Sequence, residues 1–498
     1  MSSVKQLAGQ TVYYGISSIA ARFINYLLTP YLTAVLTKAD YGKMGLVYAA
    51  IPLLNVMFTY GMETSYFRFA QQEENKPSIY STVSISLIFS TISLSAILWF
   101  FRDSLAAFAG VPDYPVLIKL SILIIALDTL STMPFAKLRQ EGRPIKFAVV
   151  RISAILVNIG FTFFFLSYCG KALQENPNSW IKCIYNPNLN PVIYVVVANL
   201  IQAAFTLFML WNEFTSFKLK FDGRLWKSMM IYSMPLIIVG MGGMINETFD
   251  RLMLRWWVPG TTTFKEEQVG VYNACYKLSI LITLFVQAFK MGAEPFFFKQ
   301  AGTANQKFTY ARVMKFFVII ITVMFLVVSL FIPVWRYFIA DKHWGGLGIV
   351  PILLLANMFL GIYYNLSIWY KLGNKTSAGA TITLIGAGIT FLINWLFIPS
   401  YGFMACAWAT FFCYGSMMVM SFVWGQKEYR IPYAWKKLTA YIVIVVFLYF
   451  VHRLVSYLLP GNLASMIAGS LILLLYMLLI IKIEKKEFRK LPVVGKWV

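Results

Sequence analysis

Long apolar segments alternate with short polar ones along the whole chain. A helix needs about 20 apolar residues to cross a hydrocarbon core about 30 Å thick, and fourteen segments are long enough. They cover residues 8–36, 42–67, 79–101, 116–137, 147–168, 190–212, 229–255, 268–297, 313–337, 346–370, 377–398, 403–424, 437–457 and 463–482. The segments of alternating hydrophobicity that mark outer-membrane barrels are missing. The pattern therefore predicts an all-α polytopic membrane protein.

The composition excludes a soluble protein carried by a membrane anchor. Of the 498 residues, 59% are hydrophobic and 13% are charged. Soluble domains are about 45–50% apolar and about 25% charged. The predicted spans also leave no stretch of about 50 residues, the length of a small domain, for a soluble unit.

The basic residues indicate a topology rather than a nucleic-acid partner. A net charge of +23 would suggest nucleic acid in a soluble chain, but here the basic side chains lie between apolar segments. An even number of spans places both termini on one side, and the segments on that side carry 28 Lys and Arg residues against 11 on the other. Because short cytoplasmic loops are rich in Lys and Arg, we expect both termini in the cytoplasm. No cleavable signal peptide is expected.

The two halves of the chain carry similar short motifs. Gly61, Glu63, Tyr66, Phe67 and Arg68 are matched 231 positions later by Gly292, Glu294, Phe297, Phe298 and Lys299. Tyr41-Gly42 and Lys137-Leu138 are matched by Val269-Gly270 and Lys371-Leu372, at offsets of 228 and 234. These matches predict two six-helix lobes related by a pseudo-two-fold axis along the membrane normal. The expected domains are an N-terminal lobe (1–216), a cytoplasmic connector (217–228), a C-terminal lobe (229–426), and two further spans with a basic tail (427–498).

The connector alternates basic and apolar residues from Phe217 to Lys227. This pattern fits a segment that lies on the cytoplasmic lipid surface as a hinge between the lobes. It fits a solvated linker equally well.

The sequence lacks signatures of catalysis and of metal binding. It contains no HExxH, no glycine-rich phosphate loop and no GxSxG motif. His343 and His452 fall at the ends of spans, where surface or interface positions are expected. Cys169 and Cys183 share one hydrophilic loop and would pair if that loop faces an oxidising space. We therefore expect no enzymatic activity, no metal and no cofactor.

Charged residues inside the spans are the remaining candidates for a functional site, because each costs at least about 2.5–3.5 kcal/mol to insert. Arg22 lies near the middle of the first span, with Asn25 on the same face, and Asp128 lies at a similar depth in the fourth. Arg22 and Asp128 form either a structural pair or a cationic site on a cavity wall, in which Asp128 tunes the arginine. An arginine suits an anionic group because its planar fork binds phosphate bidentately.

A second set of charges lies in the seventh and eighth spans. Glu247, Asp250 and Arg251 cluster towards the outer end of the seventh, with Glu247 and Arg251 four residues apart on one face. They are either a local ion-pair ladder or include a carboxylate that is protonated or binds an ion during transport. Lys277 and Lys290 point to different faces of the eighth span, so at least one can extend to the membrane surface while the other lines a cavity.

Glu63 and Glu294 occupy matching positions near the cytoplasmic ends of the second and eighth spans. They form either a gate between the lobes or helix-end caps within each lobe. The candidate residues for substrate binding are thus Arg22, Asn25, Arg251 and Lys277, and those for ion coupling or gating are Glu63, Asp128, Glu247, Asp250 and Glu294.

The segment from Asn394 to Thr410, NWLFIPSYGFMACAWAT, resembles a hairpin of the polysaccharide flippases in the multidrug/oligosaccharidyl-lipid/polysaccharide exporter superfamily. Asp40-Tyr41-Gly42, Asp250-Arg251 and Gly270-Val271-Tyr272 resemble the same family. The likeness extends over nearly the whole chain through the span count and the two lobes.

The resemblance implies a flippase that moves undecaprenyl-diphosphate-linked oligosaccharide from the cytoplasmic to the periplasmic leaflet of the bacterial inner membrane. The process served would be O-antigen (lipopolysaccharide), capsule or exopolysaccharide synthesis. The implied partners are this lipid-linked oligosaccharide, membrane lipids and other polysaccharide-assembly proteins. By analogy with the lipid II flippases, the last two spans would help to form a groove for the lipid tail.

Three other classes of protein stay open at this stage. An ion-coupled exporter of organic cations would share the fold but favour acidic and aromatic walls over Arg22 and Lys277. A membrane glycan polymerase or ligase would usually have a large outer loop, and the longest here covers residues 168–190. A structural scaffold does not explain charges inside the membrane. Since no ATP-binding motif is present, transport would depend on an ion gradient, the membrane potential or removal of product.

Overall fold

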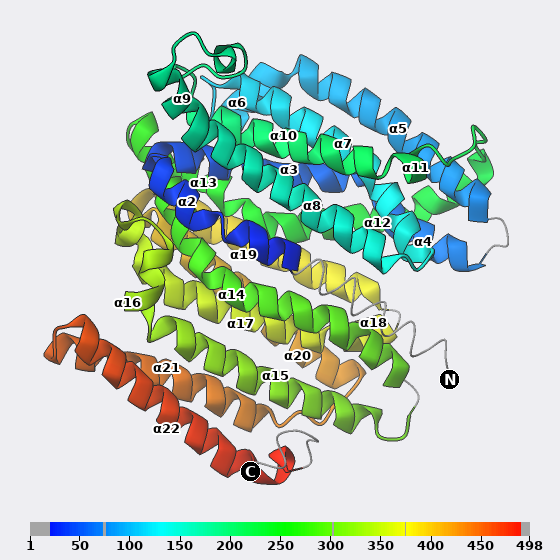
Figure 1. Cartoon of the computed structure of the whole chain (residues 1–498). Coiled ribbons are helices and arrows are strands. Elements are labelled where there is room, and N and C mark those ends of the chain that lie inside the picture. The colour runs from blue at the N-terminus through cyan, green and yellow to red at the C-terminus, as the bar shows by residue number, and fades with distance from the viewer. Residues whose placement is uncertain (1–19, 73–75, 301–302, 374, 490–498) are drawn as a thin grey trace.

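The computed structural model describes residues 20–72, 76–300, 303–373 and 375–489. Every regular element in these ranges is a helix (Figure 1). The longer helices are α3 (Lys38–Thr59), α4 (Met62–Gln72), α5 (Lys76–Phe100), α7 (Pro115–Gln140), α8 (Pro144–Phe163), α10 (Pro191–Met209), α12 (Gly223–Thr248), α13 (Asp250–Trp257), α14 (Thr262–Gln300), α15 (Gln306–Ser329), α17 (Val350–Leu366), α19 (Thr376–Tyr401), α20 (Phe403–Glu428), α21 (Trp435–Leu458) and α22 (Asn462–Phe488). Shorter elements are α2 (Thr29–Val35), α6 (Arg102–Phe108), η1 (Phe164–Cys169), α9 (Gly170–Glu175), η2 (Trp180–Cys183), α11 (Trp211–Phe214), α16 (Ile332–Trp335), η3 (Arg336–Phe338), η4 (Asp341–Ile349) and α18 (Ile368–Leu372).

The prediction of an all-α polytopic membrane protein is confirmed. Within the described ranges, twelve helices are long and apolar enough to cross a membrane, or thirteen when the bent helix α12 is counted. They correspond to the second to fourteenth predicted spans. The first predicted span, 8–36, lies partly outside the described residues, and α2 belongs to its described end.

Several helices begin where the sequence supplies a cap. Thr37 precedes α3, and its hydroxyl accepts the Asp40 N–H at 3.0 Å. Asn190 precedes α10 and accepts the Val192 N–H at 2.9 Å, next to a proline at the first helical position. Such side chains satisfy N–H groups that have no partner inside the helix.

Several predicted spans are divided between helices, and two of these breaks lie near the candidate charges. The span 42–67 breaks between α3 and α4, where Tyr60 and Gly61 have φ angles of +33° and +71°. The Tyr60 hydroxyl is held by Ser86 of α5 at 2.6 Å, which fixes this uncommon backbone position. The span 229–255 divides at Phe249 into α12 and α13, and α12 itself bends by 40° between residues 234 and 236.

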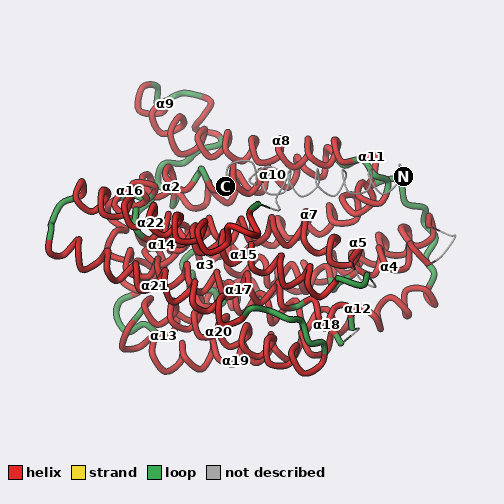
Figure 2. The backbone as a smooth tube through the Cα atoms, turned by 90° about the horizontal axis from the view of Figure 1, so that it is seen from below, coloured by secondary structure: helices red, strands yellow, loops and turns green. Residues whose placement is uncertain are grey.

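The long helices run side by side in both views of the molecule (Figures 1 and 2). Helices α5, α7, α8 and α10 lie on one side, α15, α17 and α20 lie on the other, and α3 packs against α14 between them. The hairpin of α21 and α22 packs against α15 at the edge. The end of the bundle with α11, α18 and residues 215–222 is termed the connector end, and the end with α9, α13 and α16 is termed the opposite end.

The connector is bound to α5 through backbone hydrogen bonds. The N–H of Lys218 donates to Ser81 Oγ at 2.9 Å, and the N–H of Asp222 donates to Thr82 Oγ1 at 3.2 Å. Between these two anchors the side chain of Leu219 is 92% exposed. Both interpretations of the connector, lipid-bound hinge and solvated linker, are compatible with this arrangement.

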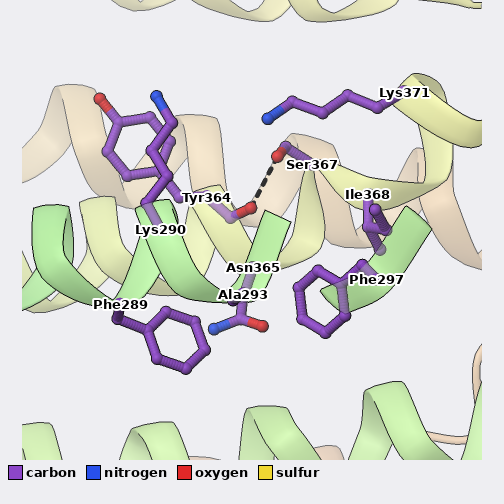
Figure 3. Close-up of a pocket in the computed structure, with 9 residues that line it drawn as sticks. All are labelled: Phe289, Lys290, Ala293, Phe297, Tyr364, Asn365, Ser367, Ile368 and Lys371. Atoms are coloured by element: carbon purple, nitrogen blue, oxygen red, sulfur yellow. Dashed lines mark hydrogen bonds between the residues drawn. The ribbon is translucent and has the colours of Figure 1, made fainter. Parts of the chain in front are cut away.

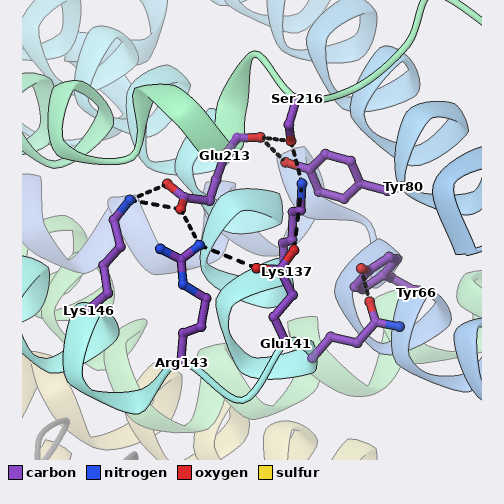
Figure 4. Close-up of polar contacts among 9 residues, drawn as sticks. Tyr66, Tyr80, Lys137, Glu141, Arg143, Lys146, Glu213 and Ser216 are labelled. Atoms are coloured by element: carbon purple, nitrogen blue, oxygen red, sulfur yellow. Dashed lines mark hydrogen bonds and ion pairs between the residues drawn. The ribbon is translucent and has the colours of Figure 1, made fainter.

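Glu213 of α11 ties the helices of the first half together at the connector end (Figure 4). Its buried carboxylate accepts hydrogen bonds from Arg143 and Lys146, each at 2.8 Å. Its carbonyl oxygen accepts the Tyr80 hydroxyl at 2.7 Å. One residue thus connects α11 to the start of α8 and to α5.

Glu484 of α22 has the same role at the edge of the bundle. Its buried carboxylate accepts hydrogen bonds from Tyr441 at 2.6 Å and from Lys315 at 3.1 Å, and it pairs with Lys437 at 2.5 Å. Because these partners lie on α15 and α21, the contact fixes the last two helices to the rest of the protein.

The possible pair of Cys169 and Cys183, which the sequence left open, consists of two free thiols: Cys169 is buried in an apolar cluster with Phe165 and Ile181, whereas Cys183 is exposed. The expectation of surface or interface positions for His343 and His452 is wrong. They are 0% and 4% exposed; His343 packs near Tyr41, and His452 contacts the Ser465 carbonyl at 2.9 Å.

Candidate functional site

A cavity of about 910 Å³ lies between the two halves of the chain. Most of its wall comes from the first half, from residues 21–32 and from α3, α7, α8 and α10. The second half contributes Met244, Thr248, Arg251, Asn273 and Lys277. Polar groups make up about half of the wall, which sets this space apart from the apolar core around it.

The opposite end of the cavity is closed by contact between the halves. Helices α3 and α14 cross there, with Gly42 against Gly270. A β-carbon on Gly42 would lie 1.9 Å from the carbonyl oxygen of Glu266, and one on Gly270 would lie 2.1 Å from that of Lys38. Only glycine allows so close an approach of two backbones.

Several further polar contacts join the halves at this end. They link Lys43 to Glu266 (3.6 Å), Arg255 Nε to the Gly110 carbonyl (3.1 Å), Trp256 Nε1 to the Phe108 carbonyl (2.7 Å) and the Ala340 N–H to Thr33 Oγ1 (3.2 Å). The cavity wall extends in the other direction to Glu63 and Arg139, near the connector end.

Arg22 and Asn25 both line the cavity. The Arg22 guanidinium donates to the Gln287 side chain of α14, so it contacts the second half of the chain. The structural pair of Arg22 with Asp128, one of the two sequence-based interpretations, is absent from the described contacts. The rotation of each helix about its axis decides such pairings, and an apolar span does not specify that rotation.

Asp128 instead lies within electrostatic range of Arg151, a residue of α8 that is not among the candidates from the sequence. Arg151 lines the cavity, and its guanidinium stacks 4.3 Å from the Phe135 ring. The feature of the sequence that indicates a membrane position for Arg151 is its place two turns inside α8, after the proline that begins the helix.

Arg251 is buried in a network of its own. It is 7% exposed and bonds Asp250 at 2.9 Å, while the Tyr272 hydroxyl donates to the same carboxylate. Its guanidinium also donates to the backbone carbonyl of Glu247. The predicted side-chain pair of Glu247 and Arg251 is replaced by these contacts, and the Glu247 side chain is exposed and does not line the cavity.

The two lysines of α14 are separated. Lys277 lines the cavity and forms no ion pair with any residue that the structure describes. Lys290 lies in a second pocket, over the Tyr364 ring at 4.4 Å and near Ser367 and Lys371 (Figure 3). That pocket has a volume of about 20 Å³, enough for one water molecule, so it cannot hold a glycan.

Glu63 forms an ion pair with Arg139 of α7, within the first half of the chain. This contact favours stabilisation inside one lobe over a gate between Glu63 and Glu294. The Glu294 side chain lies outside the described residues. In the part of the chain that the structure describes, no three His, Cys, Asp or Glu side chains are grouped to hold a metal ion.

The sequence analysis missed the uncharged polar residues of the wall. Asn199, Gln202 and Thr206 line the cavity from α10, and Asn158 lines it from α8. The spacing of Asn199, Gln202 and Thr206 indicates a polar face, because positions i, i+3 and i+7 of an otherwise apolar helix share one face.

Solved structures of transporters share this architecture. The lipid II flippase MurJ, in its inward closed conformation, aligns with a TM-score of 0.65 at 13% identity, covering 94% of this chain and 98% of its own. An inward-facing multidrug resistance MATE transporter of the MOP superfamily aligns with a TM-score of 0.61 at 14% identity, covering 87% and 95%. The fold class is therefore that of the MurJ and MATE transporters.

The family is shown by the sequence itself. Residues 7–301 match the family model described as polysaccharide biosynthesis protein. This match covers more than half of the chain, and the chain belongs to this family. A protein of the Lsg locus of Haemophilus influenzae is 21% identical over 417 residues, covering 79% of this chain and 93% of its own.

Proposed function

We propose that this protein is a flippase for undecaprenyl-diphosphate-linked oligosaccharide, serving O-antigen, capsule or exopolysaccharide synthesis in the bacterial inner membrane. The observation that carries the proposal is the cavity between the halves, which Arg22 of the first half and Lys277 of the second both line. A diphosphate that joins a lipid to a sugar carries two negative charges, one on each phosphate. Two cations that line one cavity suit that group, and the guanidinium offers bidentate contact.

Alternating access is the mechanism that this arrangement supports. The cavity is shut at the opposite end by the α3–α14 crossing and extends towards the connector end. The distribution of Lys and Arg favours the connector end as the cytoplasmic one. In this assignment the substrate enters from the cytoplasmic side, and the lobes 1–216 and 229–426 rock about the cavity to open the other side.

The carboxylates near the cavity are the candidates for coupling this motion to an ion. Glu63 and Asp250 each form an ion pair with an arginine, and Asp128 lies within electrostatic range of Arg151. Protonation or ion binding at any of them would release that arginine and change the balance between the two states. Glu247 and Glu294 remain candidates from the sequence.

The direct test is deletion of the gene, followed by extraction of lipid-linked sugars from the cells. A flippase predicts that an undecaprenyl-diphosphate oligosaccharide accumulates, and that an Arg22→Ala copy fails to clear it. An unchanged lipid pool together with new sensitivity to cationic dyes would contradict the flippase and favour an exporter of organic cations.

A further inference from the structure

Some basic side chains of the cavity wall have a carboxylate close by that neutralises their charge, and others do not; the latter are termed uncompensated. Five basic side chains line the cavity. Arg139 and Arg251 form ion pairs with Glu63 and Asp250, and Arg151 lies within electrostatic range of Asp128, which lines the same cavity. Among the lining residues that the structure describes, Arg22 and Lys277 have no such neighbour. Arg22 is bonded to the neutral Gln287.

The positive charges of Arg22 and Lys277 equal in number the two negative charges of the diphosphate diester that the proposed function places here. A bound diphosphate would therefore neutralise both cations. An acidic sugar would bring a further carboxylate into a space enclosed by helices, where an unpaired charge is strongly disfavoured.

A neutral recess adjoins this charged region in the first half of the chain. Asn158 of α8 and Asn199, Gln202 and Thr206 of α10 line it, together with Tyr48 of α3. The Asn199 amide donates to the Tyr48 hydroxyl at 3.1 Å. Gln202 also lines the cavity, and its side-chain amide forms no hydrogen bond with any residue described in the structure.

Amide side chains combine donors and acceptors on one planar group. Sugar hydroxyl and acetamido groups present the same combination. A wall of three amides and two hydroxyls therefore complements an uncharged sugar, and it offers no cation to an acidic one.

We propose, on the basis of the proposed function, that this amide recess (Tyr48, Asn158, Asn199, Gln202 and Thr206) binds the sugars next to the diphosphate, and that these sugars are uncharged. Arg22 and Lys277 hold the diphosphate. The recess then selects the glycan by its charge before the lobes rock.

The test compares two probe lipids that differ in the charge of one sugar: undecaprenyl-diphospho-N-acetylglucosamine and undecaprenyl-diphospho-glucuronic acid. Their affinities for the purified full-length protein in nanodiscs are measured by titration. We expect the neutral lipid to bind about tenfold more tightly, equivalent to about 1.4 kcal/mol.

The variant Asn199→Leu/Gln202→Leu keeps the side-chain volume and removes the amides. It should weaken binding of the neutral lipid about tenfold, a change worth about 1.4 kcal/mol. The matched control Asn178→Leu, at an exposed loop position, should leave both affinities unchanged. If the double variant is not monodisperse after purification, Gln202→Glu replaces it and should weaken the acidic lipid more than the neutral one.

The outcomes separate this inference from the proposed function. Equal or tighter binding of the acidic lipid, or an unaltered affinity in the recess variant, overturns the amide recess while the flippase stands. Failure of the wild-type protein to bind either lipid overturns both.

Discussion

Gly42 of α3 and Gly270 of α14 lie against each other where the two halves of the protein meet, and a β-carbon on either would clash with the backbone of the other helix. The internal repeat equates these two positions, Tyr41-Gly42 with Val269-Gly270. Their mutual contact supports a pseudo-two-fold axis that passes through the crossing. It also gives the closed end of the cavity a specific steric requirement.

A β-carbon at Gly42 should therefore favour opening at this end. In Gly42→Ala the new methyl group meets the Glu266 carbonyl, which is backbone and cannot rotate away. We expect faster maleimide labelling of a cysteine introduced at Met44, a buried cavity residue, when the reagent is added from the periplasmic side.

The matched control is Gly388→Ala in α19, where the added β-carbon has no neighbour within 4 Å. It should leave the labelling rate at the wild-type level. Equal rates in Gly42→Ala and wild type would show that the crossing does not close the cavity.

Removal of the Glu213 carboxylate should destabilise the connector end. Glu213→Gln removes the negative charge and one of the two acceptor oxygens that Arg143 and Lys146 share. Both cations are partly exposed, so we expect a loss of about 1–2 kcal/mol. A lower Tm of the purified protein checks this. Glu141→Gln, at a more exposed ion pair, should change stability by less than about 1 kcal/mol; a similar loss in both variants would contradict the role of Glu213.

Glu484 should hold the last two helices in place. In Glu484→Gln the cations Lys315 and Lys437 lose their common partner, and we expect about 2 kcal/mol of lost stability. Limited proteolysis between α20 and α21 should become faster. Glu428→Gln, which breaks an exposed pair with Lys375, is the comparison; unaltered proteolysis in Glu484→Gln would exclude the anchoring role.

The Asp128–Arg151 pair gives a prediction about selectivity. Asp128→Asn leaves Arg151 as a third uncompensated cation on the cavity wall. We expect it to reduce the preference for undecaprenyl-diphospho-N-acetylglucosamine over undecaprenyl-diphospho-glucuronic acid, measured by titration as above. Asp103→Asn, at an exposed pair with Arg102, should retain the wild-type preference. A preference that rises in Asp128→Asn would contradict the charge balance proposed for the cavity.

The sequence alone predicted the membrane-spanning helices, because a hydrocarbon core requires apolar spans of a minimum length. It did not reveal the break at Tyr60, since a left-handed φ at a non-glycine residue is held by a distant contact, here with Ser86. It indicated Arg22 and Lys277 as candidates, because a charged side chain inside a membrane carries a free-energy cost. It missed Arg151, because depth in a helix alone does not distinguish a cavity residue from one at the membrane surface. It proposed Asp128 as the partner of Arg22, because pairing depends on helix rotation.

The central claim is that Arg22 and Lys277 bind the diphosphate of a lipid that crosses the membrane through this cavity. The most direct measurement is the leaflet position of the lipid-linked glycan, read as the fraction bound by an external lectin in right-side-out vesicles from deletion cells. With the wild-type copy or with Lys119→Ala, a basic residue outside the cavity, the glycan should be accessible from outside. With Arg22→Ala/Lys277→Ala it should stay inaccessible, and equal accessibility in all three would contradict the account.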